Sequence, residues 1–253
     1  MQGLRLEICA DSIDSALAAQ RGGAQRIEMC ASLLEGGLTP SVGVLRTVRD
    51  LLSVELFVMI RPRGGDFCYS ETELLAMKED IRVVRSLGAD GVVLGLLDPD
   101  GRVDIVRTRE LVELARPLEV TFHRAFDVSA ELERSLEDII LTGASRILTS
   151  GGAPTAPEGL EEIRKLTRAA RDRIVILAGS GINSRNVAQV ISATGVTEVH
   201  ASAKEPAASP MRFRKSISMG RAEGGPQEYL RQVADEEEVR ALAAALRNFK
   251  AAV

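Results

Sequence analysis

Short apolar runs alternate with amphipathic stretches along most of the chain. The runs are rich in Val, Ile and Leu, which is typical of buried strands. The stretches between them carry apolar residues at helical spacing, as in 71–88, where Leu74, Ile81 and Val84 share one face. Eight strands are predicted, over residues 4–10, 25–31, 55–62, 91–97, 118–124, 145–151, 173–179 and 197–203. This alternation favours a parallel sheet with helical crossovers.

Glycines divide the chain into four similar pairs of strand and helix units. Gly23, Gly88, Gly143 and Gly195 each stand at the expected end of a helix, just before every second strand, where glycine tolerates the left-handed turn that ends a helix. Four pairs make eight strands, so we expect one (β/α)8 TIM-like barrel over residues 1–253. The alternative is a doubly wound open sheet, but the first strand is not followed by the glycine fingerprint usual there.

The regular pattern stops after the eighth predicted strand. Residues 204–229 contain three prolines, several basic residues and little periodicity, which predicts a long loop or arm. This arm could cover the barrel mouth or reach a second subunit. An Ala- and Leu-rich stretch, residues 233–249, then predicts a closing helix.

Strand parity predicts which side chains face the barrel interior. Successive residues of a strand point to opposite sides, so the apolar set of each strand must face the helices and its polar set the lumen. Strand six contributes Thr149 or Ser150 to the inward set. The inward residues of strands one, two, three, five and eight are mostly polar: Arg5, Glu7, Cys9, Arg26, Glu28, Cys30, Met59, Arg61, Thr121, His123, Glu198, His200 and Ser202.

A Glu-x-Cys element occurs on both of the first two strands. Glu7 and Cys9 recur as Glu28 and Cys30, so we expect the two thiols to be near neighbours at about the same height, and the two carboxylates likewise. Two close carboxylates need a cation between them, and Arg61 on the next strand is the expected one. Two adjacent thiolates suit a soft ion such as Cu(I). The alternative is that both cysteines are small buried apolar residues.

Further candidate residues lie near the predicted strand ends. His123 and His200 are the two histidines of the chain, and either could act as acid, base or ligand near neutral pH, or be a structural core residue. Gly179, Ser180 and Gly181 follow strand seven, where glycine-rich loops of barrels often bind phosphate, and Ser150 after strand six adds a small donor beside them. Tight turns that need glycine would give the same pattern.

Composition and charge exclude some classes of function. The net charge of −4 offers no general attraction for nucleic acid or an anionic membrane, and the sequence carries no apolar stretch near the length of a membrane span. The first residues lack a signal-peptide pattern, so we expect a cytoplasmic protein. Three cysteines, including Cys68, are too few for a disulfide framework and predict free thiols or metal ligands.

Seven motifs, occurring in order, carry a family resemblance. They are LEICADS, RIEMCASLLEGGLTPS, VMIRPRGGDFCYS, TFHRAFD, ILTSGG, GSGIN and EVHASA. Together they resemble the CutC family, named for copper homeostasis. The resemblance implies a TIM-like barrel, a cytoplasmic location and a homo-oligomer, and in copper-binding members two cysteines assigned as Cu(I) ligands fall on Cys9 and Cys30.

Three functional hypotheses follow, of which the third is a non-catalytic scaffold whose functional part is the arm at 204–229. The first is a copper homeostasis protein that binds Cu(I) through Cys9 and Cys30. The second is a barrel enzyme acting on a small anionic or phosphorylated metabolite. Its acid, base and charge-stabilising groups would be Glu7, Glu28, Arg61, His123 and His200.

Overall fold

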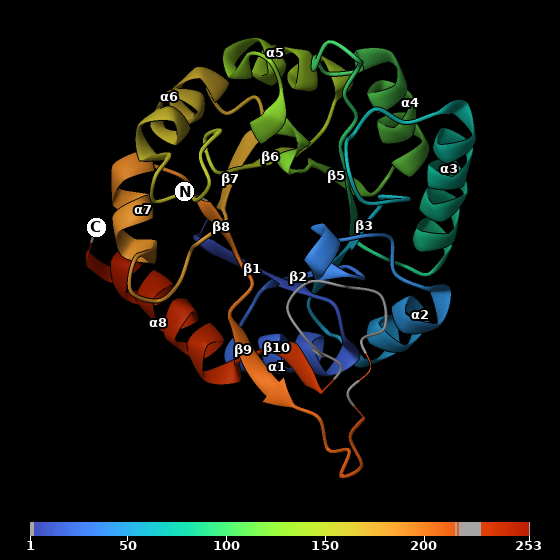
Figure 1. The fold of residues 1–253 in the computed structure, drawn as a ribbon. Helices are drawn as coiled ribbons and strands as arrows, with labels where there is room; N and C mark the ends of the chain where they lie inside the picture. Colours follow the sequence, from blue (N-terminus) through green and yellow to red (C-terminus); the bar gives the residue numbers. More distant parts are fainter. Residues whose placement is uncertain (1–2, 216, 218–228, 253) are drawn as a thin grey trace.

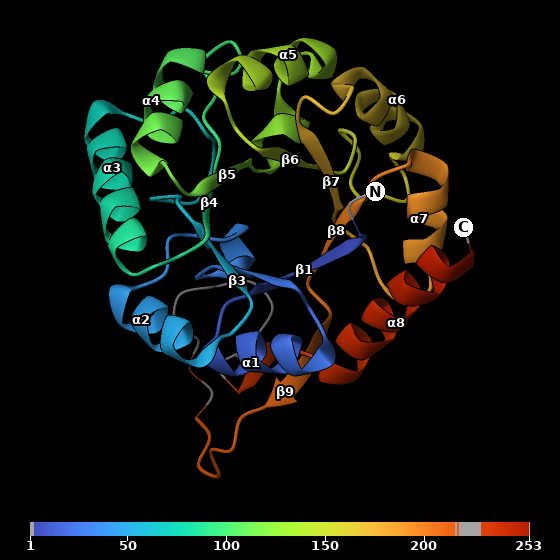
Figure 2. The same cartoon turned by 180° about the vertical axis from the view of Figure 1, so that it is seen from behind.

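The computed structural model describes residues 3–215, 217 and 229–252. Eight parallel strands form a closed barrel in sequence order, as predicted. Figure 1 shows the ring of helices around it, and Figure 2 shows the same ring from behind. The strands are β1 (Arg5–Ala10), β2 (Arg26–Met29), β3 (Glu55–Met59), β4 (Gly91–Leu94), β5 (Glu119–Phe122), β6 (Arg146–Thr149), β7 (Val175–Gly179) and β8 (Glu198–Ala201).

Eight α-helices cover the outside of the barrel among the described residues (Figure 1). They are α1 (Ile13–Gly22), α2 (Val42–Leu51), α3 (Glu71–Ser86), α4 (Ile105–Ala115), α5 (Leu132–Thr142), α6 (Leu160–Ala170), α7 (Val187–Thr194) and α8 (Glu236–Ala252). Two short 3-10 helices, η1 (Leu33–Glu35) and η2 (Arg124–Val128), follow β2 and β5. Because each outward strand face is apolar, the main core lies between the barrel and this helical layer.

Helix ends follow the signals in the sequence. Ser12 caps α1, with its Oγ accepting the Ser15 N–H at 3.2 Å, and Ser70 forms a capping box with Glu73 at the start of α3. The four glycines that precede β2, β4, β6 and β8 all have positive φ, between 76° and 100°. They therefore end helices in the way predicted.

The segment after β8 differs from the prediction in two places. Lys204–Ala208 is not loop but a strand, β9, which pairs antiparallel with β10 (Leu230–Ala234) beside α1 (Figure 1). The closing helix begins at Glu236 rather than at residue 233, because Val233 belongs to β10 and Asp235 Oδ1 accepts the Glu237 N–H at 2.9 Å as an N-terminal cap. Residues 216 and 218–228 of the predicted arm lie outside the described residues.

Helix α8 completes the ring. It contacts both α7 and α1, so it occupies the position that a helix directly after β8 would take. Among the described residues, none of the helices is both long and apolar enough to cross a lipid bilayer.

Candidate functional site

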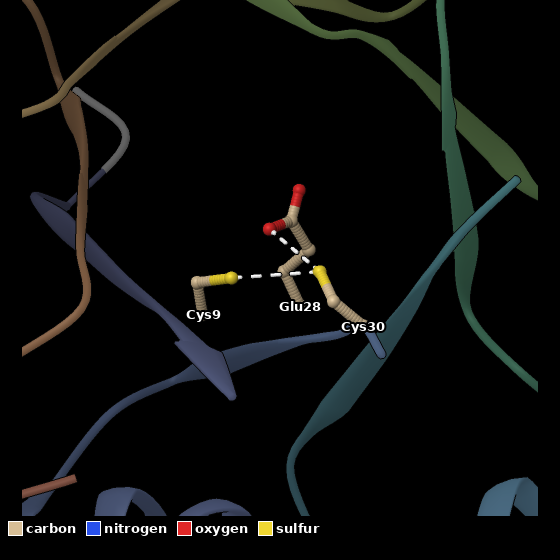
Figure 3. A group of neighbouring side chains, drawn as sticks. All are labelled: Cys9, Glu28 and Cys30. Atoms are coloured by element: carbon tan, nitrogen blue, oxygen red, sulfur yellow. Dashed lines mark hydrogen bonds between the residues drawn. The ribbon is translucent and has the colours of Figure 1, made fainter. Parts of the chain in front are cut away.

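Cys9 and Cys30 meet inside the barrel. Their Sγ atoms are 3.5 Å apart, and the residues are 6% and 1% exposed. Both point into the lumen, with the Glu28 carboxylate beside them (Figure 3). Phe57, Met59 and Val93 form an apolar cluster with the two cysteines, separate from the core under the helices. Strand parity therefore predicted the meeting of the two thiols correctly.

The two Glu-x-Cys elements are not at the same height. In the β1–β2 register Cys9 lies opposite Glu28, and Glu7 lies opposite Arg26. The expected level pairing is therefore wrong by two residues, because strands of a closed barrel are staggered. Cys30 stands one inward position above Cys9, and its Sγ donates to Glu28 Oε2 at 3.4 Å.

Arg26, and not Arg61, neutralises the buried carboxylate of Glu7. Arg26 is fully buried and donates from Nε to Glu7 and from Nη2 to Glu198. Its guanidinium also lies over the Phe57 ring, 4.7 Å from the centroid. The expected role of Arg61 between the acids is therefore wrong.

His200 is the second cation beside the two acids. Its Nδ1 lies 2.6 Å from Glu7 Oε1 and its Nε2 lies 3.9 Å from Glu28 Oε2. Burial lowers the pKa of His200, but Glu28, Cys9 and Glu7 outweigh burial and raise this pKa well above its usual value. His200 is therefore a buried imidazolium at neutral pH, which donates its Nδ1–H to Glu7.

The two acids respond differently to the same surroundings. Burial raises the pKa of Glu7, but Arg26 and His200 outweigh it and lower this pKa to about 2. Burial raises the pKa of Glu28, and here the attraction of His200 does not cancel it. Glu28 Oε1 has no hydrogen-bond partner among the described residues. Glu7 is thus a fixed anion, and Glu28 is the acid more readily protonated.

Both thiols are protonated at neutral pH. The hydrogen bond with Cys30, burial and the charge of Glu28 raise the pKa of Cys9 well above its usual value. For Cys30, the hydrogen bond with Cys9 lowers the pKa, but burial and the neighbouring carboxylates raise it to about 12. Any metal that binds between the sulfurs must therefore displace protons.

His123 differs from His200 in charge. It follows β5 and is buried, and its Nδ1 accepts the Ala125 N–H at 3.1 Å. Burial and the charge of Arg61 lower the pKa of His123 to about 3, so the ring is neutral. The chain therefore holds one charged and one neutral imidazole in the same barrel.

Arg61 holds the loops above the cysteines. Its guanidinium donates to the backbone carbonyls of Glu35, at 2.6 Å, Gly37, at 3.0 Å, and Gly65, at 2.9 Å. Gly37 in turn covers the cysteine pair, since a Cβ built there would lie 3.2 Å from Cys30 Sγ. Arg61 thus holds in place the loop that contains Gly37 and covers the cysteine pair.

Ser150 is held in a structural network and does not line the cavity. Its Oγ accepts a hydrogen bond from Arg124 Nη2 at 2.7 Å, and its N–H donates to Asp127 at 3.1 Å. Asp127 also accepts from Thr149 Oγ1 at 2.5 Å and the Gly152 N–H at 3.1 Å. The structure therefore separates Ser150 from the rest of the predicted anion site.

The loop after β7 reaches the cavity through Ser180 and Gly181, which both have positive φ. Gly179 acts differently, because a Cβ there would lie 3.2 Å from the Cβ of His200 and 2.5 Å from Leu148 Cδ1. Gly179 thus leaves room for the His200 side chain. Anion binding by this loop stays a prediction.

A cavity of about 390 Å³ opens beside Cys9, whereas Cys30 is not among its lining residues. Cys9, Glu28 and His200 form part of its lining, and Arg61 and His123 form another part. Its lining also includes Arg124, Ser180, Gly181 and Lys204. Four of the five predicted acid and base residues therefore share one cavity, while Glu7 lies beneath it in contact with His200.

Two groups of candidate metal ligands occur among the described residues. Cys9, Glu28 and Cys30 form one, and Glu7, Glu28 and His200 form the other. Sequence reasoning placed Arg26 and Met59 inside the barrel but gave neither a role in the site. The role of Arg26 could have been inferred from its position two residues before Glu28, because residues two apart on a strand point to the same side.

Comparison with known proteins gives one consistent result. The model of the CutC family matches residues 4–205. A CutC family protein of Chromobacterium violaceum is 51% identical over 241 residues, covering 95% of this chain and 97% of the relative. The human copper homeostasis protein cutC homolog is 46% identical over 247 residues, covering 97% of this chain and 90% of the relative. A solved structure of CutC from Streptococcus agalactiae is similar with a TM-score of 0.75 and 32% identity, covering 79% of this chain and 98% of that one.

Proposed function

Because the chain belongs to the CutC family, we propose that it serves copper homeostasis by binding Cu(I) between Cys9 and Cys30. The observation that carries the proposal is the 3.5 Å separation of the two sulfur atoms. At this distance small rotations about the side-chain bonds let both sulfurs bind one ion. The human relative is named a copper homeostasis protein, which agrees with this assignment.

The surroundings of the sulfurs favour a soft monovalent ion. Phe57, Met59 and Val93 supply an apolar wall that excludes water, and thiolates prefer Cu(I) to hard ions such as Mg²⁺. Zinc would need further ligands to complete a tetrahedral set, and Glu28 is the one nearby carboxylate in the same group as both cysteines. The two-sulfur geometry thus supports Cu(I) more directly than zinc.

Charge balance supports the same ion. Two thiolates and one Cu(I) carry a net charge of −1, and His200 contributes a buried positive charge that contacts Cys9. Glu28, whose pKa is raised, can accept the proton that Cys30 releases across the existing 3.4 Å hydrogen bond. The neighbours of the cysteines are thus suited to compensate the charge and proton changes of binding.

The proposal includes the compartment and the assembly. A cytoplasmic location would keep both thiols reduced and available. Exposed apolar side chains on the segment after β9, Met211 and Phe213 among them, support assembly into a homo-oligomer. Sedimentation of the purified protein tests this part, since a monomer at all concentrations would contradict it.

The test is anaerobic titration with Cu(I) against a competing chelator. We expect about one Cu(I) per chain in wild type and at least ~100-fold weaker binding in Cys9→Ser and in Cys30→Ser, because each loses one of two thiolate ligands. Cys68→Ser is the matched control, because Cys68 is exposed and its backbone carbonyl binds Arg63 rather than either of the two buried cysteines. Unchanged affinity in both site variants would reject the proposal. A Zn²⁺ titration of wild type with tighter binding than Cu(I) would also reject it.

A further inference from the structure

The wall of the cavity across from the cysteines carries a second set of polar groups. The barrel closes in the order β1 to β8, so β5 lies opposite β1 across the lumen. His123 directly follows β5, and it lines the same cavity as Cys9. Copper binding between the cysteines makes no use of this residue.

Two contacts fix the orientation of the His123 ring. The Ala125 N–H donates to Nδ1, and the Phe67 ring lies against the imidazole with centroids 4.9 Å apart. The ring also fills the space beside Gly95 that a side chain would need, since a Cβ there would lie 2.5 Å from Nδ1. The ring therefore has little freedom to turn.

This orientation also fixes the tautomer. Because Nδ1 accepts a hydrogen bond, the neutral ring carries its hydrogen on Nε2. Nε2 is buried and has no hydrogen-bond partner within the described part of the chain. The low pKa of His123, about 3, agrees with a neutral ring. His123 is thus a fixed N–H donor without an acceptor, which is unfavourable in a finished core.

Arg61 contributes a second donor of the same kind. Its Nη1 and Nη2 atoms bind backbone carbonyls, whereas its buried Nε has no partner among the described residues. The Phe67 ring also contacts Arg61, with 5.0 Å between Cζ and the ring centroid. His123 and Arg61 therefore flank one aromatic ring in one cavity, and the Arg61 guanidinium also lies next to the buried Tyr69 hydroxyl.

We propose that this cavity binds a small organic oxyanion, a carboxylate or a phosphate ester, through His123 Nε2–H and Arg61 Nε–H. Both groups donate, and Arg61 adds a full positive charge, so the ligand must accept hydrogen bonds and carry negative charge. Lys204 lies in the same lining and adds positive charge, whereas the charge of Arg124 is already paired with Asp127 at 2.7 Å. A volume of about 390 Å³ fits a metabolite and not a polymer.

The two histidines allow a direct test. Protein labelled with ¹⁵N at histidine gives ring signals from His123 and His200 alone, and a His123→Phe sample assigns them. One arm adds inorganic phosphate and the other adds acetate, both at constant ionic strength against sodium chloride. We expect the ¹⁵N chemical shift of His123 Nε2 to change saturably with anion concentration, while the ¹⁵N shift of Nδ1 shows that the ring stays neutral. Saturation with phosphate alone identifies a phosphate ligand, and saturation with acetate alone identifies a carboxylate ligand.

Variants separate this site from the copper site. Arg61→Lys should weaken binding of the active anion at least ~10-fold, because the Nε–H is lost. Arg63→Lys is the matched control, since Arg63 lies on the same loop but pairs with Glu73 outside the cavity. If Arg61→Lys does not fold, His123→Phe measured by calorimetry replaces it, with the same expected loss. The shift should persist in Cys9→Ser.

Two results would overturn the proposal. One is a His123 signal that responds to neither anion beyond the chloride control. The other is unchanged anion binding in Arg61→Lys, which would show that only the positive charge at this position matters and not the Nε–H.

Discussion

Cys9 lies level with Glu28, not with Cys30, in the register of β1 and β2. The stagger of the closed barrel places Cys30 one inward position higher, so the two sulfurs approach each other diagonally, 3.5 Å apart. Glu28 then contacts the pair from the strand that carries Cys30, at 3.4 Å from its sulfur. A carboxylate that can accept a proton thus belongs to the thiol pair.

Arg26 should be the most important charged residue for stability. Replacing it with Met leaves Glu7 and Glu198 buried without their partner, so we expect the free energy of unfolding to fall by about 3–5 kcal/mol. Urea denaturation measures this. Arg21→Met is the control, because the ion pair of Arg21 with Glu236 is exposed and should contribute little to stability. Similar losses in both variants would contradict this assignment.

His123 should make stability depend on pH in a defined direction. Its pKa is about 3 in the folded protein and 6.5 without the fold, so between these values the unfolded chain binds a proton that the native state does not. The contribution is therefore complete above about pH 6.5 and is lost as pH falls toward 3. We expect the stability difference between wild type and His123→Phe to change by up to about 1.4 kcal/mol per pH unit in this window. Denaturation curves at several pH values measure it, and parallel pH profiles for the two proteins would contradict it.

Copper affinity should rise with pH. Both thiols are protonated at neutral pH, since the pKa of Cys30 is raised to about 12 and that of Cys9 well above its usual value. Binding between two thiolates displaces two protons, of which Glu28 can keep one, so the logarithm of the affinity should increase by about one to two per pH unit. Chelator competition at a series of pH values measures this slope. A slope of zero would mean that the ion does not bind as a bis-thiolate complex.

Gly37 should control the position of Cys30. Its φ is +93° and a Cβ there would lie 3.2 Å from Cys30 Sγ and 3.3 Å from Met59 Cε, so Gly37→Ala must displace these atoms. We expect Cu(I) affinity to fall roughly 10-fold, as for other residues that position metal ligands. Gly88→Ala is the matched control, because Gly88 has φ +76° with nothing within 4 Å of its Cβ position. Equal affinities in both variants would show that the covering loop does not position the sulfur.

The fold and the meeting of the cysteines could be predicted because both depend on local patterns. Runs of Val, Ile and Leu marked the strands, and alternation along β1 and β2 placed Cys9 and Cys30 inside. Alternation says nothing about how far neighbouring strands slide, so the level pairing of Glu7 with Glu28 was wrong.

The partners of the buried ion pairs could not be predicted from local sequence patterns either. Arg61 was the expected partner of the acids because it lies on the next strand end, but its length carries the guanidinium into the loops that hold Gly37. Arg26 fills the role because the barrel stagger sets it opposite Glu7. Likewise, β9 was missed because its pairing with β10 is set by contact between segments far apart in the sequence.

Copper K-edge X-ray absorption of the Cu(I)-loaded protein tests the central claim most directly. The account predicts two sulfur neighbours for copper in wild type and in Cys68→Ser, and fewer than two in Cys9→Ser and Cys30→Ser. A copper site with only nitrogen or oxygen neighbours in wild type, or two sulfur neighbours that persist in both site variants, would contradict it.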